Sequence, residues 1–177
     1  MSDKRSILCF GDSLTWGWIP VEESSPTLRY PYHQRWTGAM ASQLGDGYHI
    51  VEEGLSARTT TCDDPNDRRL NGSTYLPTAL ASHLPLDLVI LMLGTNDTKS
   101  YFHRTSYEIA NGMAKLVGQV NEAARAGIET SHREGSAENS PAVHVDRLSG
   151  DGARLVGAEK KRRLRDFRRG LAAPLQD

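Results

Sequence analysis

The sequence lacks the long apolar runs and the cysteines that mark several classes of protein. No apolar stretch approaches the ~20 residues that a membrane-spanning helix needs. The apolar run that follows the first residues is too short for the core of a signal peptide. Two cysteines are too few for a disulfide framework. We therefore expect a soluble, cytoplasmic protein with no membrane partner.

An excess of charge of one sign is missing as well. The 177 residues hold 21 Lys and Arg against 22 Asp and Glu, so the net charge does not favour nucleic acid or an acidic surface as partner.

Cys9 lies in an apolar run, where a small buried thiol fits. Cys62 has no second Cys or His at ligand spacing. We predict no metal, no cofactor and no nucleic-acid partner.

The chain has little that builds a core from Gly127 onward. These 51 residues contain 18 charged residues and a single Phe, with no Trp or Tyr. The basic run over 159–169 is typical of a solvated helix or a disordered tail. A nucleic-acid or phospholipid contact is the alternative, which the absence of interleaved aromatic residues disfavours. We predict an α/β domain over residues 1–126 and a charged, poorly patterned segment over 127–177.

Strand-like runs alternate with helical patterns in the first part of the chain. Strands are predicted over 5–10, 48–53 and 86–93, and helices over 36–44, 76–84 and 109–120. Such alternation predicts a parallel sheet with helices on both faces. No core strand is expected after the third, so the fold is predicted to be truncated or altered there. One side of the third strand would then be unpaired, which favours self-association.

A serine stands where the first strand gives way to a helix. Catalytic groups gather at the carboxyl ends of parallel strands, and Ser13, Gly54 and Asn96 each follow or end one of the three strands. A serine becomes a nucleophile when a base takes its proton, and the oxyanion then formed needs donors already in place. Each signal alone is also typical of a turn or a cap. Their common edge favours a site, with the N–H groups of Ser13 and Gly54 and the Asn96 amide as donors.

The three segments resemble the first three motif blocks of the GDSL, or SGNH, hydrolases. The matching residues are Gly11-Asp12-Ser13-Leu14, Gly54 and Gly94-Thr95-Asn96-Asp97. The surrounding sequence is similar to the arylesterase and acyltransferase branch over roughly residues 5–122. The resemblance implies a flavodoxin-like α/β fold, Ser13 as nucleophile, and an oxyanion hole of Ser13, Gly54 and Asn96. It also implies a small or aryl ester as substrate and a homo-oligomer.

The base is the part of this pattern that the sequence does not supply. The family has a late Asp-x-x-His motif, and the C-terminal part of the chain has none. His144 is the candidate there, because strand alternation would put His144 and Asp146 on one face. Surface or loop roles are expected for the earlier histidines, His33, His49, His83 and His103.

Three functions therefore stay open. The leading prediction is a serine esterase or acyltransferase that is impaired because its His base is missing. The second is a catalytically inactive relative that acts as a binding or assembly subunit. The third is a flavodoxin-like domain that binds phosphate at the turn of residues 11–14, which the lack of a Lys or a Gly-rich cradle disfavours.

Overall fold

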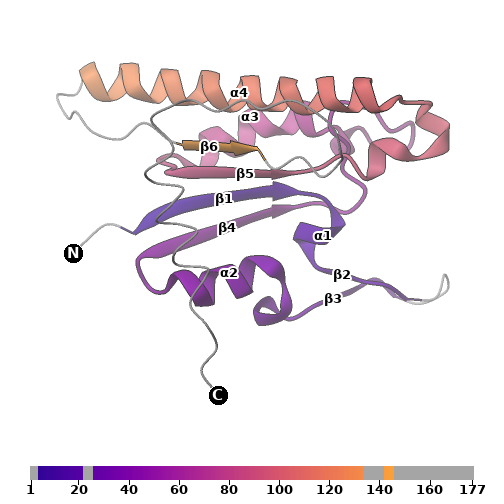
Figure 1. The fold of residues 1–177 in the computed structure, drawn as a ribbon, viewed down its shortest axis with the longest axis horizontal. Coiled ribbons are helices and arrows are strands. Elements are labelled where there is room, and N and C mark those ends of the chain that lie inside the picture. The colour runs from indigo at the N-terminus through magenta and orange to yellow at the C-terminus, as the bar shows by residue number, and fades with distance from the viewer. Residues whose placement is uncertain (1–3, 22–25, 134–141, 146–177) are drawn as a thin grey trace. The chain divides into compact units, whose positions relative to one another are not determined.

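The computed structural model describes residues 4–21, 26–133 and 142–145 (Figure 1). The chain divides into two compact units, Met1–Asp146 and Arg147–Asp177, and the second lies outside the described residues. In the described part, no helix combines the length and the apolar character needed to cross a membrane.

The first unit is built on a parallel sheet. Its order is β4-β1-β5-β6, and every neighbouring pair is parallel. The strands are β1 (Arg5–Gly11), β4 (Tyr48–Gly54), β5 (Leu88–Met92) and β6 (Ala142–Val145). The direction in which the chain adds strands reverses at β1, so the topological switch point lies between β1 and β5. The predicted parallel sheet is confirmed, with β5 shorter than expected.

The expectation that no strand follows the third is wrong. β6 pairs with β5 from Leu88 opposite Ala142 to Leu91 opposite Val145, so the outer side of β5 is paired over these residues. The segment Ala142–Val145 is four residues long and stands in a charged stretch. A run this short gives no measurable periodicity, and only the backbone of a neighbouring strand makes it a strand.

Helices cover both faces of the sheet, as the alternation predicts. α2 (Trp36–Leu44) lies on one face, and α3 (Gly72–His83) and α4 (Ser106–Arg133) lie on the other (Figure 1). The main core lies between the sheet and α3 and α4, where apolar side chains from all three gather. Its buried members are Leu8, Phe10, Leu76, Ala79, Leu80, Leu86, Val89, Leu91, Leu116 and Val120.

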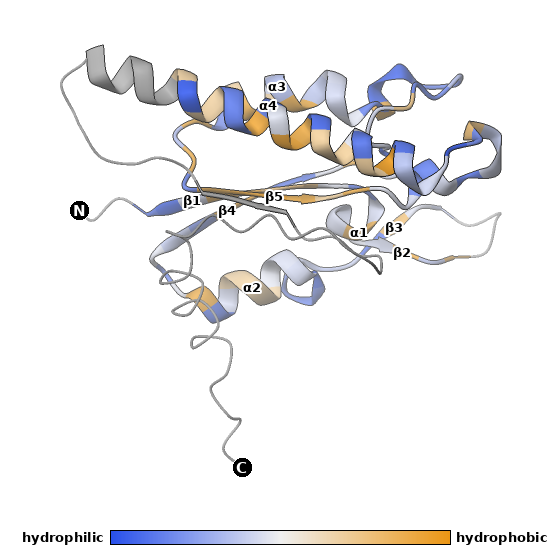
Figure 2. Cartoon of the chain, turned by 45° about the horizontal axis from the view of Figure 1, so that its top comes forward, coloured by the Kyte–Doolittle hydropathy of each residue, from blue (hydrophilic) through white to orange (hydrophobic). Residues whose placement is uncertain are grey.

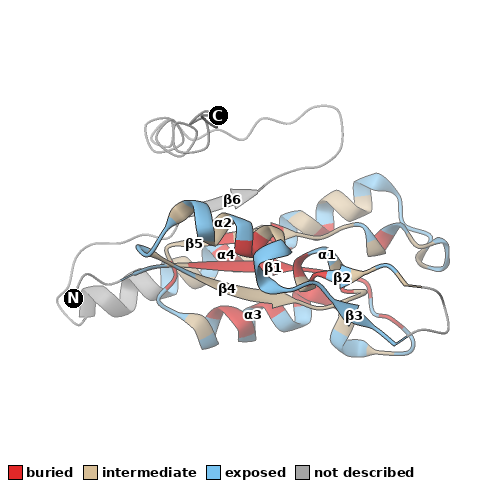
Figure 3. Cartoon of the chain, turned by 90° about the horizontal axis from the view of Figure 1, so that it is seen from below, coloured by how far each residue is buried: buried red, intermediate tan, exposed pale blue. Residues whose placement is uncertain are grey.

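Hydropathy and burial follow this layering. The central strands are hydrophobic, whereas α4 alternates between hydrophobic and hydrophilic residues (Figure 2). β1 is buried over its last five residues, and the outer strand β4 is of intermediate burial (Figure 3). A strand with neighbours on both sides and helices on both faces must be apolar throughout, which explains the unbroken run Ile7–Phe10.

A capping box fixes the start of α4. The hydroxyl of Thr105 accepts from the Glu108 N–H at 3.3 Å, and the Glu108 carboxylate accepts from the Thr105 N–H at 2.8 Å. Two backbone donors that the helix leaves free are thereby satisfied. Thr105 therefore caps α4.

A proline inside α3 creates a contact with α4. Pro77 has no N–H, so the carbonyl of Ser73 lacks its helical donor. The side-chain amide of Gln119 on α4 donates to that carbonyl at 2.8 Å. A buried backbone acceptor is thus satisfied by the neighbouring helix, which sets the position of α4 along α3.

Several short elements escape the sequence patterns. These are α1 (Ser13–Trp16), the antiparallel pair β2 (Trp18–Ile19) and β3 (Leu28–Arg29), and the 3₁₀ turns η1 (Tyr32–Gln34), η2 (Arg68–Leu70), η3 (Asn96–Thr98) and η4 (Ser100–Phe102). Elements of two to four residues are too short to show a period. Local hydrogen bonds form α1 and the 3₁₀ turns, and β2 and β3 are formed by pairing with each other.

Gly54 lets the first helix lie directly on the end of β4. A Cβ at this position would be 2.3 Å from the backbone N of Trp16 and 2.7 Å from the backbone C of Thr15. These are backbone atoms, which cannot move aside as a flexible side chain would. The absence of a side chain at Gly54 therefore sets how closely α1 approaches the sheet.

We expect Gly54→Ala to lower the free energy of unfolding by about 2 to 3 kcal/mol, because the new methyl group displaces α1. Urea unfolding of the two proteins measures the difference. Gly47→Ala is the matched control, because a Cβ there meets nothing within 4 Å, and it should change stability by less than about 0.5 kcal/mol. Equal unfolding curves for both variants would contradict the close packing.

Candidate active site

Ser13 is the first residue of α1 and lies just beyond the carboxyl end of β1. Asp12 caps this one-turn helix, because its Oδ1 accepts from the Leu14 N–H at 3.0 Å. Ser13 is half-buried, and its hydroxyl makes no hydrogen bond to any residue that the structure describes. A serine held at a helix start with a free hydroxyl can approach a ligand.

Asn96 lies in η3, beyond the carboxyl end of β5. Its Nδ2 donates to the carboxylate of Asp12 at 3.3 Å and to the carbonyl of Arg58 at 3.0 Å. Both hydrogens of the amide are therefore in use. The contact with Asp12 ties the loop after β5 to the residue that precedes Ser13.

Gly54 ends β4 beside the last residue of β1. Gly11 pairs with Gly54, and the Gly11 carbonyl accepts from the Leu55 N–H at 3.1 Å. Alternate residues of a parallel strand face the neighbouring strand, so the N–H of Gly54 is not used by β1. The structure thus places Ser13, Gly54 and Asn96 at one edge of the sheet.

A buried arginine joins the ends of β1 and β4. Arg58 is 2% exposed, and its Nη1 donates to the carbonyl of Gly11 at 3.0 Å and to that of Glu53. Its guanidinium carbon is 4.2 Å from the centre of the Phe10 ring. Burial lowers the pKa of Arg58, and the charge of Glu53 opposes this shift. Arg58 therefore acts as a cationic clamp across the two strand ends.

A buried aspartate joins the loops after β4 and β5. The carboxylate of Asp97 accepts from the Thr60 N–H at 2.9 Å, from the Thr60 hydroxyl and from the Cys62 thiol at 3.5 Å. Neither Asp97 nor Arg58 was predicted to have this role. Each is a charged residue in the segment that follows a strand, and a charge that becomes buried there needs partners.

The turn after β4 has a backbone conformation unusual for its residue. The Arg58 N–H donates to the Leu55 carbonyl at 3.1 Å, and Ala57 has a φ of 69°. A positive φ at the third position is that of a type II turn, which favours glycine. A non-glycine residue held there is strained, as residues at functional sites often are. Nothing in the sequence marked Ala57.

Both cysteines are buried and free. Cys9 is buried in β1, and burial, followed by the charge of Glu52, raises its pKa to about 12. Cys62 is buried against Asp97. Across the ranges that the structure describes, no three His, Cys, Asp or Glu residues could together hold a metal ion.

No described histidine side chain forms a hydrogen bond with Ser13. His33, His49 and His103 are exposed, and Nε2 of His83 lies 2.9 Å from the carboxylate of Glu53. Asp46 and His49 have the Asp-x-x-His spacing, yet His49 pairs with Ser6 near the amino end of β4. At ~3.3 Å per residue, that is ~16 Å from Gly54.

The candidate base is only partly within the described structure. The backbone of His144 lies in β6, where it pairs with Ile90 of β5. Asp146 lies outside the described residues. The structure therefore brings together the nucleophile and the donors of the predicted site, and it leaves the pair His144 and Asp146 as a prediction.

Comparison with known proteins decides the family. Residues 9–173 match the model of the GDSL-like lipase/acylhydrolase family. The chain belongs to this family. The match extends well past residue 122, where the resemblance seen in the motifs ends. Comparison with curated proteins gives no match.

Solved structures of the GDSL-like family are similar over most of the chain. A carbohydrate acetylesterase from Sinorhizobium meliloti is 77% identical with a TM-score of 0.71, covering 80% of this chain and 63% of that one. The aryl esterase of M. smegmatis is 58% identical with a TM-score of 0.70, covering 80% and 62%. Its inhibitor-bound form is 57% identical with a TM-score of 0.70. The chain thus spans less than two thirds of the length of these proteins.

The fold changes the titration of the Asp12 carboxyl as well as that of Arg58. Asp12 is 2% exposed. Burial raises its pKa above the usual value, and the hydrogen bond from the Leu14 N–H and the charge of Arg58 oppose the shift only in part. The folded state therefore holds the Asp12 proton more tightly than the unfolded state does.

We expect Asp12→Asn to change how stability depends on pH. A raised folded pKa means that the contribution of Asp12 is fully present below its unfolded pKa of ~3.9 and is lost as pH rises through the folded value. The unfolding free energy of the variant, relative to the parent, should therefore increase between pH 4 and pH 7.

Urea unfolding at several pH values measures this slope. The test is how the difference in unfolding free energy between variant and parent changes with pH. The lost contact with Asn96 adds the same amount to this difference at every pH. Asp46→Asn, at an exposed position, is the control. A pH-independent difference for Asp12→Asn would contradict the raised pKa.

Proposed function

We propose that the protein is a serine esterase or acyltransferase that acts on small or aryl esters. The observation that carries the proposal is the 3.3 Å contact between Asn96 and Asp12. It brings an amide donor beside the turn that holds Ser13, while Gly54 lies against the same turn from β4. One hydroxyl and several N–H donors are thereby gathered at the switch point of the sheet.

The chemistry follows from this arrangement. The Ser13 Oγ attacks the ester carbonyl carbon, its proton passes to a base, and the carbonyl electron pair moves onto oxygen. The N–H groups of Ser13 and Gly54 and the Asn96 amide donate to that oxyanion. Asn96 gives up its longer contact, to Asp12, when it does so. The alcohol leaves with the proton, and water or a second alcohol then takes the acyl group from Ser13.

The substrate class is inferred from the relatives. One is named an aryl esterase and another a carbohydrate acetylesterase. Acetyl is a small acyl group, and both names describe ester cleavage. We therefore propose a small acyl group on an aryl or sugar oxygen as the ester.

The proposed base is His144, oriented by Asp146. An aspartate two residues along a strand lies on the same face as the histidine, which is the support for the pair. The family's Asp-x-x-His spacing is missing in this part of the sequence. Because this pair departs from the family's spacing, we propose that it is a poorer base and that catalysis is impaired, with complete loss of a triad member, about 10³ to 10⁶ in rate, as the upper limit.

We expect Ser13→Ala to abolish the release of p-nitrophenol from p-nitrophenyl acetate that the parent catalyses, because no other hydroxyl replaces the nucleophile. Initial rates of the two proteins, corrected for buffer, measure the effect. Ser42→Ala, at an exposed position of α2, should keep the parental rate. Equal rates for the parent and Ser13→Ala would remove Ser13 from catalysis.

The second candidate is an inactive relative that serves as a binding or assembly subunit. This candidate is favoured because the C-terminal part of the chain has no Asp-x-x-His motif. A fluorophosphonate probe separates the two proposals, because it labels only an activated serine. We expect labelling that peptide mapping places on Ser13 and that Ser13→Ala removes. An unlabelled parent protein would favour the binding subunit.

We also propose that the chain forms a homo-oligomer. The support is the exposure of large apolar side chains on β2 and β3 and in the segment from β3 into η1: Trp18, Leu28, Tyr30 and Tyr32. Light scattering should give at least twice the chain mass of 19.5 kDa. Leu28→Ser should lower it, and Tyr107→Ser, on exposed α4, should not. A monomeric parent would contradict this proposal.

A further inference from the structure

The helix that carries Ser13 is too short to hold its own position. α1 has four residues, and its helical hydrogen bonds run from Trp16 N to Asp12 O at 2.9 Å and from Gly17 N to Ser13 O at 2.8 Å. Helix formation has a costly nucleus, so a single turn is unstable by itself. The position of Ser13 therefore depends on what binds the two ends of α1.

The N-terminal end of α1 is bound by the site itself. Asp12 caps it and in turn accepts from Asn96. The C-terminal end has a different partner. The Nε of Arg29 donates to the carbonyl of Trp16 at 2.5 Å, and its guanidinium carbon is 5.1 Å from the centre of the Trp16 ring. A cation at the last carbonyls of a helix satisfies groups that the helix leaves unpaired.

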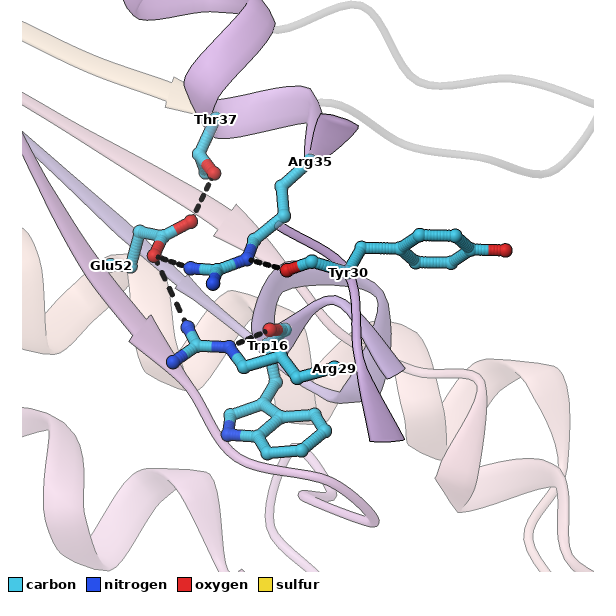
Figure 4. A network of polar contacts seen from close by, with 6 residues as sticks. All are labelled: Trp16, Arg29, Tyr30, Arg35, Thr37 and Glu52. Atoms are coloured by element: carbon cyan, nitrogen blue, oxygen red, sulfur yellow. Dashed lines mark hydrogen bonds and ion pairs between the residues drawn. The ribbon is translucent and has the colours of Figure 1, made fainter. Parts of the chain in front are cut away.

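Arg29 is itself held by a buried carboxylate. Its Nη2 lies 3.2 Å from Oε2 of Glu52, which also accepts from Arg35 at 2.5 Å, while Oε1 accepts from the Thr37 hydroxyl (Figure 4). The Glu52 side chain is only 13% exposed. A largely buried carboxylate that accepts from three side chains is held in one position, so it provides a fixed point.

Arg35 reinforces the same end of α1. Its Nε donates to the carbonyl of Tyr30 at 2.8 Å, and the N–H of Tyr30 donates to the carbonyl of Gly17 at 2.7 Å. Gly17 closes α1 with a φ of 87°. A Cβ there would be 2.8 Å from the Arg35 Cδ, so the arginine stem lies directly against the helix end.

We propose that Arg29 and Glu52 form an anchor that holds the C-terminal end of α1, and with it Ser13, in place at the edge of the sheet. Glu52 stands two residues before Gly54 on β4, so the anchor fixes α1 to the strand against which it packs. Arg29 and Glu52 are positioning residues, because they act through the backbone of α1. The catalytic half of this inference rests on the proposed function of Ser13.

Arg29→Gln tests the anchor, because the Arg29 side chain is 37% exposed and its loss leaves the Glu52 to Arg35 pair intact. We expect the α1 amides of Trp16 and Gly17 to exchange hydrogen about tenfold faster, as loss of one charge-assisted hydrogen bond implies. Exchange in β1 should be unchanged. The kcat for p-nitrophenyl acetate should fall about tenfold at constant KM, because a displaced nucleophile weakens the transition state more than binding.

Arg69→Gln is the matched control. It breaks an exposed pair with Asp67, at 2.7 Å, remote from α1 in the sequence. It should leave exchange at α1 and kcat at parental values. Exchange is measured in peptides that cover residues 13–17 and in peptides that cover β1. A general loss of stability would raise exchange in both, whereas loss of the anchor raises it at α1 alone.

The outcomes separate the anchor from the proposed function. Parental exchange at α1 in Arg29→Gln overturns the anchor, whatever the activity. Faster exchange with unchanged kcat in a parent active through Ser13 also overturns it, because Ser13 is then not held by these residues. If Arg29→Gln exchanges faster at α1 and the parent has no Ser13-dependent activity, the result supports the anchor and refutes the esterase. Faster exchange with lower kcat supports both.

Discussion

The candidate site depends on the contact between the backbone of α1 and Gly54. A Cβ on Gly54 would be 2.3 Å from the Trp16 N, so α1 lies as close to β4 as backbone atoms allow. This contact, together with the pairing of Gly11 and Gly54, sets where Ser13 stands. A larger residue at either strand end would move α1 away and separate the hydroxyl from the donors.

The carboxyl edge is also where the fold buries charge. Asp12, Arg58 and Asp97 are each no more than 2% exposed, and each binds backbone or side-chain groups from another loop. Such burial is costly unless every charge is satisfied. The hydrogen bonds that these three charges make are the same ones that join the strand ends, although the buried Nε of Arg58 has no partner among the described residues. The groups that offset the cost of burying charge therefore also hold the loops of the edge together.

The sequence predicted the strands and helices whose apolar residues recur in a regular pattern. Three strands and three helices have apolar periodicity, and Ser13, Gly54 and Asn96 follow from the rule that strand ends share an edge. β6 and the pair β2 and β3 have no period to read, since a neighbouring segment makes them strands. Glu52 looked like an ordinary strand residue, because its role comes from arginines 17 and 23 positions away. Ala57 was hidden for a different reason: its strain is a property of the backbone, not of the residue type.

The proposed oxyanion donors and the proposed base come from different parts of the chain. The contacts described around Ser13, Gly54 and Asn96 lie between β1 and η3, and they include those of Asp12, Arg58 and Asp97 and the Arg29 and Glu52 anchor. None of these hydrogen bonds uses a residue after η3. The geometry of the donors is therefore independent of the group that takes the proton. Donors held in position beforehand stabilise an oxyanion with little reorganisation, which here is the Asn96 amide leaving the Asp12 carboxylate. In the proposed esterase, these donors and substrate binding would supply the rate that remains where the base is weak.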